Sequence, residues 1–362
     1  MKRILVLGGS GFLGSAVRAR LTGPDLPGRT DRDLGGWTGS AGRISPVLGG
    51  GEHVRILRGE RSPGSDLTVD LAVATVDSLA RGLETLAPDV VVNCAGALAG
   101  PASELCAVNA RGPAVLAEAM ALAAPWARLV HLGSAAEYGS AQAGSALSER
   151  AATRPTGVYG AAKLAGTLAV CGSGLDAVVL RVFNPVGAGA PAAGLPGRLA
   201  AAFRAAPPHG TVRTGSLAAY RDFVDVRDVA EAVVLAATVP GPLPPVLNIG
   251  SGRAVRARTL AEALAVIAAF TGRIEESGGG AGRPVGADWQ QADIALATQT
   301  LGWRPARTLR DALTALWRAT APEQHRELAL RSISTGPGPG SGPRALSAVF
   351  GRPVAPVART RP

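Results

Sequence analysis

Short runs rich in apolar residues alternate along the chain with segments in which apolar positions recur at helical spacing. A short, nearly continuous apolar run is typical of a strand that is buried on both faces of a parallel sheet. Runs of this kind lie at 4–7, 53–57, 89–93, 127–132, 177–182 and 246–249. Each of them is expected to form a strand.

The segments between these runs predict helices. Helical spacing extends over 15–21, 77–86, 102–123, 156–171 and 226–237, and over 259–271 and 309–321 nearer the C-terminus. Strands that alternate with helix-length segments predict βαβ units and hence a parallel sheet. The expected fold class is therefore α/β, with a doubly wound sheet of the Rossmann type and a smaller C-terminal lobe.

Two stretches depart from this alternation. Residues 24–52 are rich in Gly, Pro and Arg and have no clear period, which predicts a long inserted loop. Residues 333–362 consist largely of Gly, Pro, Ser and Arg, with four arginines and no acidic residue. Such a composition cannot bury enough apolar surface to fold, so it predicts a disordered tail.

Composition limits the class of protein. A chain of 362 residues, of which 47% are hydrophobic, can build a sizeable core in two domains or one large α/β unit. Its three cysteines are scattered, with no CxxC spacing, which disfavours disulfides and a metal site and favours a reducing, cytoplasmic compartment. The apolar runs are too short to predict a membrane span, and the first is followed by glycines, unlike a signal peptide.

The charge is strongly positive, with 37 basic and 27 acidic residues and a formal net charge of +10. Nearly all of the basic residues are arginine, since Lys2 and Lys163 are the only lysines. A general compositional bias explains this, and attraction to anionic ligands such as phosphates is the functional alternative. Because basic and aromatic residues do not cluster together, nucleic acid is not an expected partner.

A glycine-rich turn follows the first expected strand. Its sequence is Gly8-Gly9-Ser10-Gly11-Phe12-Leu13-Gly14. Gly8 permits the tight turn, Gly11 lets the backbone approach a pyrophosphate, and Gly14 lets the next helix pack closely on the sheet. The start of that helix would direct free N–H groups and the positive end of its dipole at the phosphates. The turn therefore predicts a dinucleotide cofactor, with Phe12 and Leu13 beside it.

The residue after the second expected strand would contact the adenosine ribose of this cofactor. An acid there favours NAD, and an arginine favours the 2′-phosphate of NADP. Arg58 follows the run at 53–57, so the sequence favours NADPH, with NAD as the alternative. Asp70 and Leu71 would lie beside the adenine, and Ala95, after the run at 89–93, completes the expected cofactor site.

Tyr159 and Lys163 are four residues apart, on one face of an expected helix. The positive charge of Lys163 would lower the pKa of the Tyr159 phenol, which could then act as a general acid or base near neutral pH. Lys163 could also hydrogen-bond the nicotinamide ribose. Ser134 follows the run at 127–132, where its hydroxyl could hold a substrate carbonyl. These three residues are the expected catalytic set.

Further motifs occur along the chain in a characteristic order. They are Asn93-Cys94-Ala95-Gly96, Arg181-Val182-Phe183-Asn184, Arg221-Asp222-Phe223 and Asn248-Ile249-Gly250-Ser251-Gly252. Together with the glycine turn, Ser134, Tyr159 and Lys163, they make the chain resemble the extended short-chain dehydrogenase/reductase family, also called the NAD-dependent epimerase/dehydratase family. Members of this family modify nucleotide sugars. The resemblance covers about residues 1–320, apart from 24–52.

The resemblance implies the substrate contacts and the organisation of the chain. Asn184 would contact the diphosphate or the glycosyl oxygen of a nucleotide sugar, and Arg221 and Arg283 would bind the diphosphate, which each guanidinium can bind bidentately. Residues 1–182 and 222–250 would form the NAD(P)-binding domain. Residues 183–221 and 251–332 would form a discontinuous substrate lobe. A homodimer is expected, because members of the family are often homodimers.

The residues around Ser134 help to choose among the reactions of this family. Dehydratases carry an acid where this chain has Ala135 and Ala136, so water elimination would lack its base. None of the four histidines stands in a motif that matches the 3,5-epimerases. Glu137 and the run 221–229 look most like GDP-4-keto-6-deoxy-D-mannose reductases and related 4-ketoreductases.

The expected function is therefore reduction of an NDP-4-keto-6-deoxyhexose, with Tyr159 as the proton donor. An NAD-dependent NDP-sugar 4-epimerase is the alternative, because it needs the same three residues. A catalytically silent protein that senses NAD(P) is a further alternative of another class.

Overall fold

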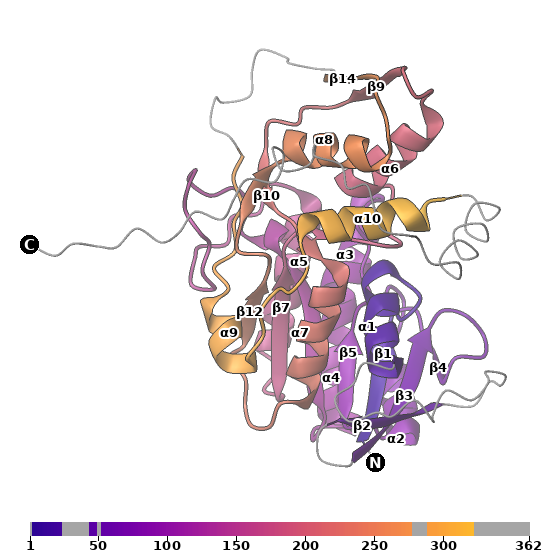
Figure 1. Cartoon of the computed structure of the whole chain (residues 1–362). Helices are drawn as coiled ribbons and strands as arrows, with labels where there is room; N and C mark the ends of the chain where they lie inside the picture. Colours follow the sequence, from indigo (N-terminus) through magenta and orange to yellow (C-terminus); the bar gives the residue numbers. More distant parts are fainter. Residues whose placement is uncertain (1, 24–42, 49–51, 277–287, 322–362) are drawn as a thin grey trace, which may run out of the picture.

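The apolar runs of the sequence pair into one central sheet in the computed structural model, which describes residues 2–23, 43–48, 52–276 and 288–321 (Figure 1). The strand order is β12-β7-β6-β5-β1-β3-β2. The parallel strands are β1 (Lys2–Leu7), β3 (Glu52–Glu60), β5 (Val90–Asn93), β6 (Arg128–Ser134), β7 (Ala177–Val182) and β12 (Val246–Ile249). A short strand, β4 (Leu67–Thr68), pairs with the end of β3.

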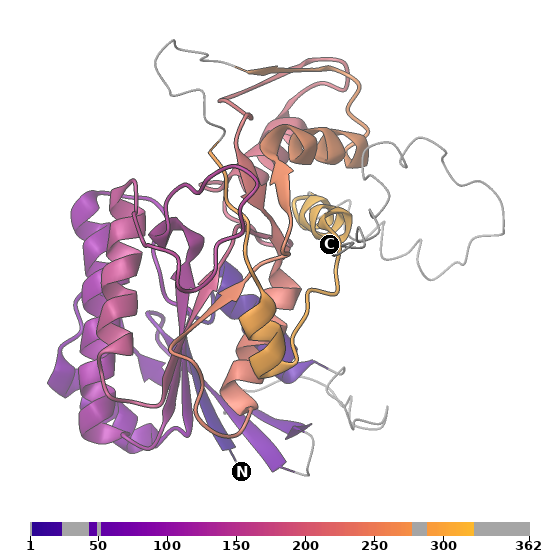
Figure 2. The ribbon, with the colours of Figure 1, turned by 90° about the vertical axis from the view of Figure 1, so that its left-hand side faces the viewer.

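Helices cover both faces of the sheet, as Figure 2 shows. One face packs on α1 (Phe12–Thr22), α7 (Val226–Thr238) and α9 (Ala295–Leu301). The other face packs on α2 (Val76–Leu86), α4 (Gly112–Ala123) and α5 (Val158–Cys171). Successive strand residues point to opposite faces, so Ile4 and Val6 join the first core while Leu5 and Leu7 join the second. The predicted doubly wound α/β fold is confirmed.

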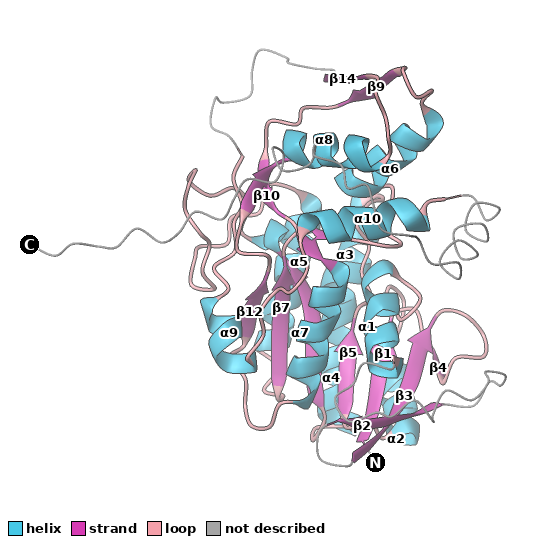
Figure 3. Cartoon of the chain, viewed as in Figure 1, coloured by secondary structure: helices cyan, strands magenta, loops and turns pink. Residues whose placement is uncertain are grey.

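A smaller lobe stands over the carboxyl ends of the strands (Figure 3). Its core lies among α6 (Leu195–Ala205), α8 (Ala257–Ile267) and α10 (Leu309–Ala319). Three pairs of short strands complete it, namely β9 (Thr211–Thr214) with β14 (Arg273–Glu276), β10 (Tyr220–Asp222) with β13 (Ala254–Arg256), and β8 (Pro185–Val186) with β11 (Val224–Asp225). These strands are too short for a period to show in the sequence.

The chain crosses between the two parts more than once. It leaves the sheet after β7, enters the lobe, and returns through α7, which covers the sheet, and β12, which pairs with β7. It then enters the lobe again with β13 and α8. The functional division into a cofactor domain and a substrate lobe stays a prediction.

The prediction of an uninterrupted loop over 24–52 is wrong for part of that range. Residues Arg43–Leu48 form β2, which runs antiparallel to β3 along the open edge of the sheet. The register shifts between Ser45 and Leu48, around Pro46. Proline has no N–H to donate, so it is tolerated on an edge strand and at a bulge. Residues 24–42, 49–51 and the predicted tail at 333–362 lie outside the described residues.

The predicted helix over 102–123 is interrupted. α3 (Ala102–Cys106) is followed by a π-helical turn at Ala107–Arg111 and then by α4. Pro113 cannot donate the α-helical hydrogen bond to the carbonyl of Asn109, which accounts for the change of register. Helix α5 packs closely there, since a Cβ on Gly166 would lie 2.3 Å from the Asn109 carbonyl oxygen.

Candidate functional site

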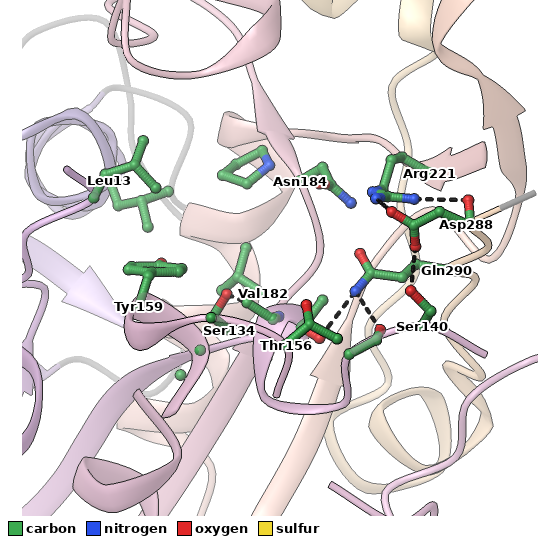
Figure 4. A pocket seen from close by; sticks show the side chains of 18 residues that line it. Leu13, Ser134, Ser140, Thr156, Tyr159, Val182, Asn184, Arg221, Asp288 and Gln290 are labelled. Carbon is green, nitrogen blue, oxygen red and sulfur yellow. Dashed lines mark hydrogen bonds and ion pairs between the residues drawn. The ribbon is translucent and has the colours of Figure 1, made fainter. Parts of the chain in front are cut away.

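Two adjoining cavities open at the carboxyl ends of the central strands, below the small lobe. Their volumes are about 390 Å³ and about 630 Å³, and Tyr159, Asn184 and Arg221 line both. The smaller cavity also contains Ser134 and Gln290 in its wall (Figure 4). The larger one extends from Phe12 and Leu13 past Lys163 to the lobe. The edge where parallel strands end is where open α/β sheets place their ligands.

The glycine turn has the backbone geometry that the sequence predicts. Gly8 adopts a φ of 69°, which favours glycine. A Cβ on Gly14 would lie 2.1 Å from the Gly8 carbonyl oxygen, so helix and turn can approach this closely only with glycine there. No side chain caps α1, which begins after Gly11, so its first N–H groups are available to an anion. Phe12 and Leu13 line the larger cavity.

Arg58 and Glu60 lie near the end of β3, and their opposite charges favour different cofactors. A guanidinium N–H of Arg58 donates to the carbonyl of Gly64 at 2.7 Å, and Arg58 lines neither cavity. Glu60 forms a 3.1 Å ion pair with Arg18. A Cβ on Gly9 would lie 3.3 Å from a Glu60 carboxylate oxygen, so this acid borders the glycine turn. Glu60 is not among the residues that the sequence predicts for the site.

The other expected adenine contacts lie outside the walls of both cavities. The Asp70 carboxylate accepts the Ala72 N–H at 3.0 Å, and Leu71 is buried in the core beneath α2 and α4. Ala95 packs directly on the turn, because a Cβ on Gly8 would lie 2.8 Å from the Ala95 backbone. The neighbouring Cys94 lines the larger cavity, and burial raises the pKa of its thiol to about 12.

The structure brings Ser134, Tyr159 and Lys163 together. Ser134 ends β6, and its hydroxyl accepts the Ala136 N–H at 3.2 Å. Tyr159 and Lys163 lie one turn apart on α5. The Lys163 ammonium donates to the carbonyl of Leu132 at 2.9 Å, and burial lowers its pKa to about 8.

The expected direction of the Tyr159 pKa shift is wrong. Burial raises this pKa, and the negative charge of Glu137 raises it further, while a hydrogen bond with Ser134 opposes both. Lys163 is not among the groups that shift it. The phenol is therefore protonated at neutral pH, which suits a proton donor.

Glu137 supports the site from the protein interior. Its side chain is fully buried and accepts the Ser134 N–H at 2.7 Å and the Arg181 guanidinium at 2.7 Å. Arg181 in turn lies over the ring of Tyr138, 4.6 Å from its centroid. Both oxygens of Glu137 are thus engaged by the protein itself, which leaves this carboxylate a positioning role.

The expected substrate residues lie on the lobe side of the smaller cavity (Figure 4). The Asn184 amide donates to the carbonyl of Asp222 at 3.0 Å. Arg221 forms an ion pair with Asp288 and donates to the carbonyl of Tyr220 at 2.9 Å. A diphosphate would therefore compete with the Asp288 carboxylate for this guanidinium. Arg283 lies outside the described residues.

The sequence does not predict that Asn109 and Gln290 lie at the site. On the π-helical turn, the Asn109 amide donates to the Ala97 carbonyl at 2.7 Å and accepts the Ala97 N–H at 3.1 Å. A Cβ on Gly96 would lie 3.1 Å from the Lys163 nitrogen and 3.2 Å from the Asn109 oxygen, so both side chains pack against Gly96. No local pattern reveals either residue, because each acts through a contact distant in sequence.

Neither a metal-binding cluster nor a membrane-spanning helix is present among the described residues. These residues contain no group of three or more His, Cys, Asp or Glu side chains arranged to hold a metal ion. Within the same part of the chain, no helix has both the length and the apolar character needed to cross a membrane.

Comparisons with known proteins agree with this architecture. The model of the NAD dependent epimerase/dehydratase family matches residues 4–250. A dTDP-6-deoxy-L-talose 4-dehydrogenase (NAD(P)(+)) from Kitasatospora kifunensis is 38% identical over 330 residues, covering 88% of this chain and 96% of that protein. A dTDP-glucose 4,6-dehydratase from Streptomyces niveus is 35% identical over 195 residues, covering 51% and 54%. The solved structure of RMD from Pseudomonas aeruginosa complexed with NADPH shares the fold, with a TM-score of 0.69 and 23% identity over 88% of this chain and 98% of that one.

The buried Lys163 makes a testable contribution to stability. Its pKa is about 8 in the folded chain against 10.5 for the ordinary group, so the unfolded chain binds more protons between these values. Stability then rises with pH across this window, by up to about 3 kcal/mol at about 1.4 kcal/mol per pKa unit. We expect the free energy of unfolding of wild type, minus that of Lys163→Met, to increase from pH 8 to pH 10 in urea titrations. A difference that stays constant with pH would contradict the lowered pKa.

Proposed function

Because the chain belongs to the NAD-dependent epimerase/dehydratase family, we propose that it is an NAD(P)-dependent oxidoreductase that acts on a nucleotide-activated sugar. Its proposed reaction is reduction of the 4-keto group of an NDP-4-keto-6-deoxyhexose. The observation that carries this proposal is that Tyr159 lines both cavities, so one phenol faces a cofactor space and a substrate space. The Kitasatospora relative is named as a 4-dehydrogenase of a dTDP-6-deoxyhexose. That name supports oxidoreduction at C4 of the sugar and favours dTDP as the nucleotide.

The residues present fit a dinucleotide. The uncapped start of α1 and the tight glycine turn offer N–H groups to a pyrophosphate. The larger cavity leads from this turn to Tyr159 and Lys163. When bound there, the nicotinamide would supply the hydride. We propose that the sheet part of the chain holds this cofactor and that the small lobe holds the nucleotide sugar.

Tyr159 and Ser134 would act on the carbonyl of the sugar. The raised pKa of Tyr159 keeps its proton on the phenol until the carbonyl oxygen gains negative charge, and the phenol then donates it. Ser134 can hydrogen-bond the same oxygen from the end of β6. The Ser134 hydrogen bond also opposes the rise in the pKa of Tyr159, which eases the loss of the proton.

A dehydratase reaction would lack its acidic residue beside Ser134. Ala135 and Ala136 line the cavity beside Ser134, where an acid would be needed. Glu137 follows them, but its carboxylate is buried and bonded to Arg181. This supports oxidoreduction at C4 over loss of water.

A 4-epimerase with bound NAD is the second candidate, and Glu60 favours it. An acid that borders the glycine turn can accept hydrogen bonds from the ribose hydroxyls of NAD. Arg58 favours NADPH and hence the reductase. A silent NAD(P)-sensing protein is disfavoured, because Ser134, Tyr159 and Lys163 are all present at the cavities.

We also propose that the protein is a homodimer. Leu122 and Trp126, at the end of α4 and just beyond it, are 69% and 61% exposed, and Leu168 on the adjacent α5 is 62% exposed. Because α4 and α5 pack on each other, these exposed apolar side chains favour a surface that a partner covers. A second copy of this chain would cover them.

The proposed reaction is tested by following absorbance at 340 nm with NADPH and dTDP-4-keto-6-deoxyglucose. We expect consumption of NADPH in proportion to keto sugar. Tyr159→Phe should lower kcat by about 100-fold or more, the usual contribution of a general acid. Tyr138→Phe is the matched control, because the Tyr138 hydroxyl bonds Asn248 at 2.8 Å away from the cavities, and it should retain activity. If the protein co-purifies with NAD and interconverts two C4 epimers, the proposed reductase function is wrong and the protein is the 4-epimerase. Cofactor binding with neither reaction would favour the silent protein.

Cofactor choice is tested by two substitutions in β3 that replace a charged side chain with an uncharged one. If the protein uses NADPH, Arg58→Gln should weaken NADPH binding by about tenfold or more and leave NADH unchanged, because hydrogen bonds to charged groups contribute about 1.5–3 kcal/mol. Glu60→Gln should weaken NADH binding only if the acid contacts the ribose. Dissociation constants from fluorescence titration distinguish the two, and an unchanged NADPH affinity in Arg58→Gln would refute the assignment of Arg58.

The homodimer is tested by charging the exposed apolar surface. Leu122→Glu and Leu168→Glu should convert a dimer to monomers in sedimentation velocity, since each places an unpaired carboxylate in the interface. Val266→Glu is the control, because Val266 is 47% exposed on α8 in the small lobe. A wild-type protein that sediments as a monomer at all concentrations would exclude the proposal.

A further inference from the structure

Gln290 is a buried polar residue in the wall of the smaller cavity. It belongs to the segment at 288–293, its side chain reaches the loop that follows β6, and that side chain is 7% exposed. Its amide nitrogen donates to the carbonyl of Ala135 at 3.2 Å and to that of Gly139 at 2.7 Å. Both N–H donors of the amide are thereby used on backbone carbonyls.

These two bonds determine which way the amide points. A carbonyl oxygen can only accept, so the group that faces Ala135 and Gly139 must be the nitrogen, and rotating the amide would bring three oxygens together. The amide oxygen of Gln290 is therefore fixed on the opposite side. In Figure 4 it is turned toward the cavity, on the side of Asn184. Among the described residues, none donates a hydrogen bond to it.

The position of this oxygen determines which part of the proposed sugar it would face. Ser134 and Tyr159 lie on one side of the cavity and Arg221 on the other, with Gln290 between them in the wall (Figure 4). On the proposed function, the reacting carbonyl lies at Tyr159 and the diphosphate at Arg221. The ring of the sugar spans the distance between them, so the Gln290 oxygen faces ring substituents and not the reacting carbonyl.

We propose that Gln290 determines substrate specificity by accepting a hydrogen bond from a hydroxyl on C2 or C3 of the sugar. This inference rests on the proposed function and narrows its substrate class to hexoses that retain that hydroxyl. When the sugar fills the cavity it excludes water from this fixed acceptor, so an analogue that lacks the hydroxyl leaves the acceptor desolvated and unpaired and is rejected. A ring carbon bearing only hydrogen would therefore be a poor fit.

The test combines two variants with a set of substrates. Wild type and Gln290→Met are compared on dTDP-4-keto-6-deoxyglucose and on its 2-deoxy and 3-deoxy analogues, by kcat/KM and by the Kd of the corresponding 4-hydroxy sugars in calorimetry. Methionine keeps the size of the side chain and removes the amide. Gln291→Met is the matched control, because the amide of Gln291 donates to Gly252 at 3.0 Å and lies outside the walls of both cavities.

We expect wild type and Gln291→Met to prefer the full substrate over one of the deoxy analogues by about tenfold or more, the equivalent of one hydrogen bond of about 1.4 kcal/mol. Gln290→Met should reduce that ratio to within about twofold. If Gln290 were purely structural, Gln290→Met would lower kcat/KM equally for all substrates and leave the ratio unchanged. That result would overturn the inference. Equal affinity of wild type for all three sugars would also overturn it. If no turnover occurs but the Kd values show the same preference of wild type for the full sugar, and its loss in Gln290→Met, the proposed reaction is rejected. The role of Gln290 in binding the sugar is then supported.

Discussion

The geometry of the site depends on one buried carboxylate, that of Glu137. It joins the end of β6 to β7, because it accepts a hydrogen bond from the Ser134 backbone and another from Arg181. Withdrawing a carboxylate from water is costly, and the paired guanidinium offsets that cost only while both partners remain in place. The same charge raises the pKa values of both Tyr159 and Lys163. Glu137 therefore fixes the backbone at Ser134 and raises the pKa values of Tyr159 and Lys163, on which burial has the larger influence, without lining either cavity.

The sequence was sufficient where function depends on local spacing. The glycine turn and the pair Tyr159 and Lys163 lie within single βα or helical units, so the period of a strand or helix determines how their groups face. It was insufficient where function depends on contacts between distant parts of the chain. Glu137 and Arg181 are 44 residues apart, and Gln290 and Ala135 are 155 apart, so no local pattern in the sequence predicts either contact. The pKa of Tyr159 differs from the prediction for a related reason, because burial, which only the folded chain creates, raises it, while Lys163 does not shift it.

The polar groups around the cavities fall into two kinds. Asn109 and the amide nitrogen of Gln290 bond backbone groups, and Glu137 bonds both the Ser134 backbone and the Arg181 side chain; these groups hold the loops that form the walls. Tyr159, Ser134 and Arg221 face the space itself. Groups of the first kind lose little freedom when a ligand arrives, since they are already held in place. Apart from Arg221, whose ion pair with Asp288 an anionic ligand would replace, a site built this way needs little reorganisation to become complementary to a polar ligand.

The crossing of the chain between sheet and lobe has a consequence for biosynthesis. During translation, β7 is made about 70 residues before β12, the strand that pairs with its outer edge, because the lobe segment intervenes. Until β12 is added, the nascent chain presents an unpaired strand edge, to which another chain could add. Tyr138 also lacks its hydrogen-bond partner over that interval, since Asn248 belongs to β12. The last strand to join the sheet thus both protects it from intermolecular pairing and completes the polar core beneath the site.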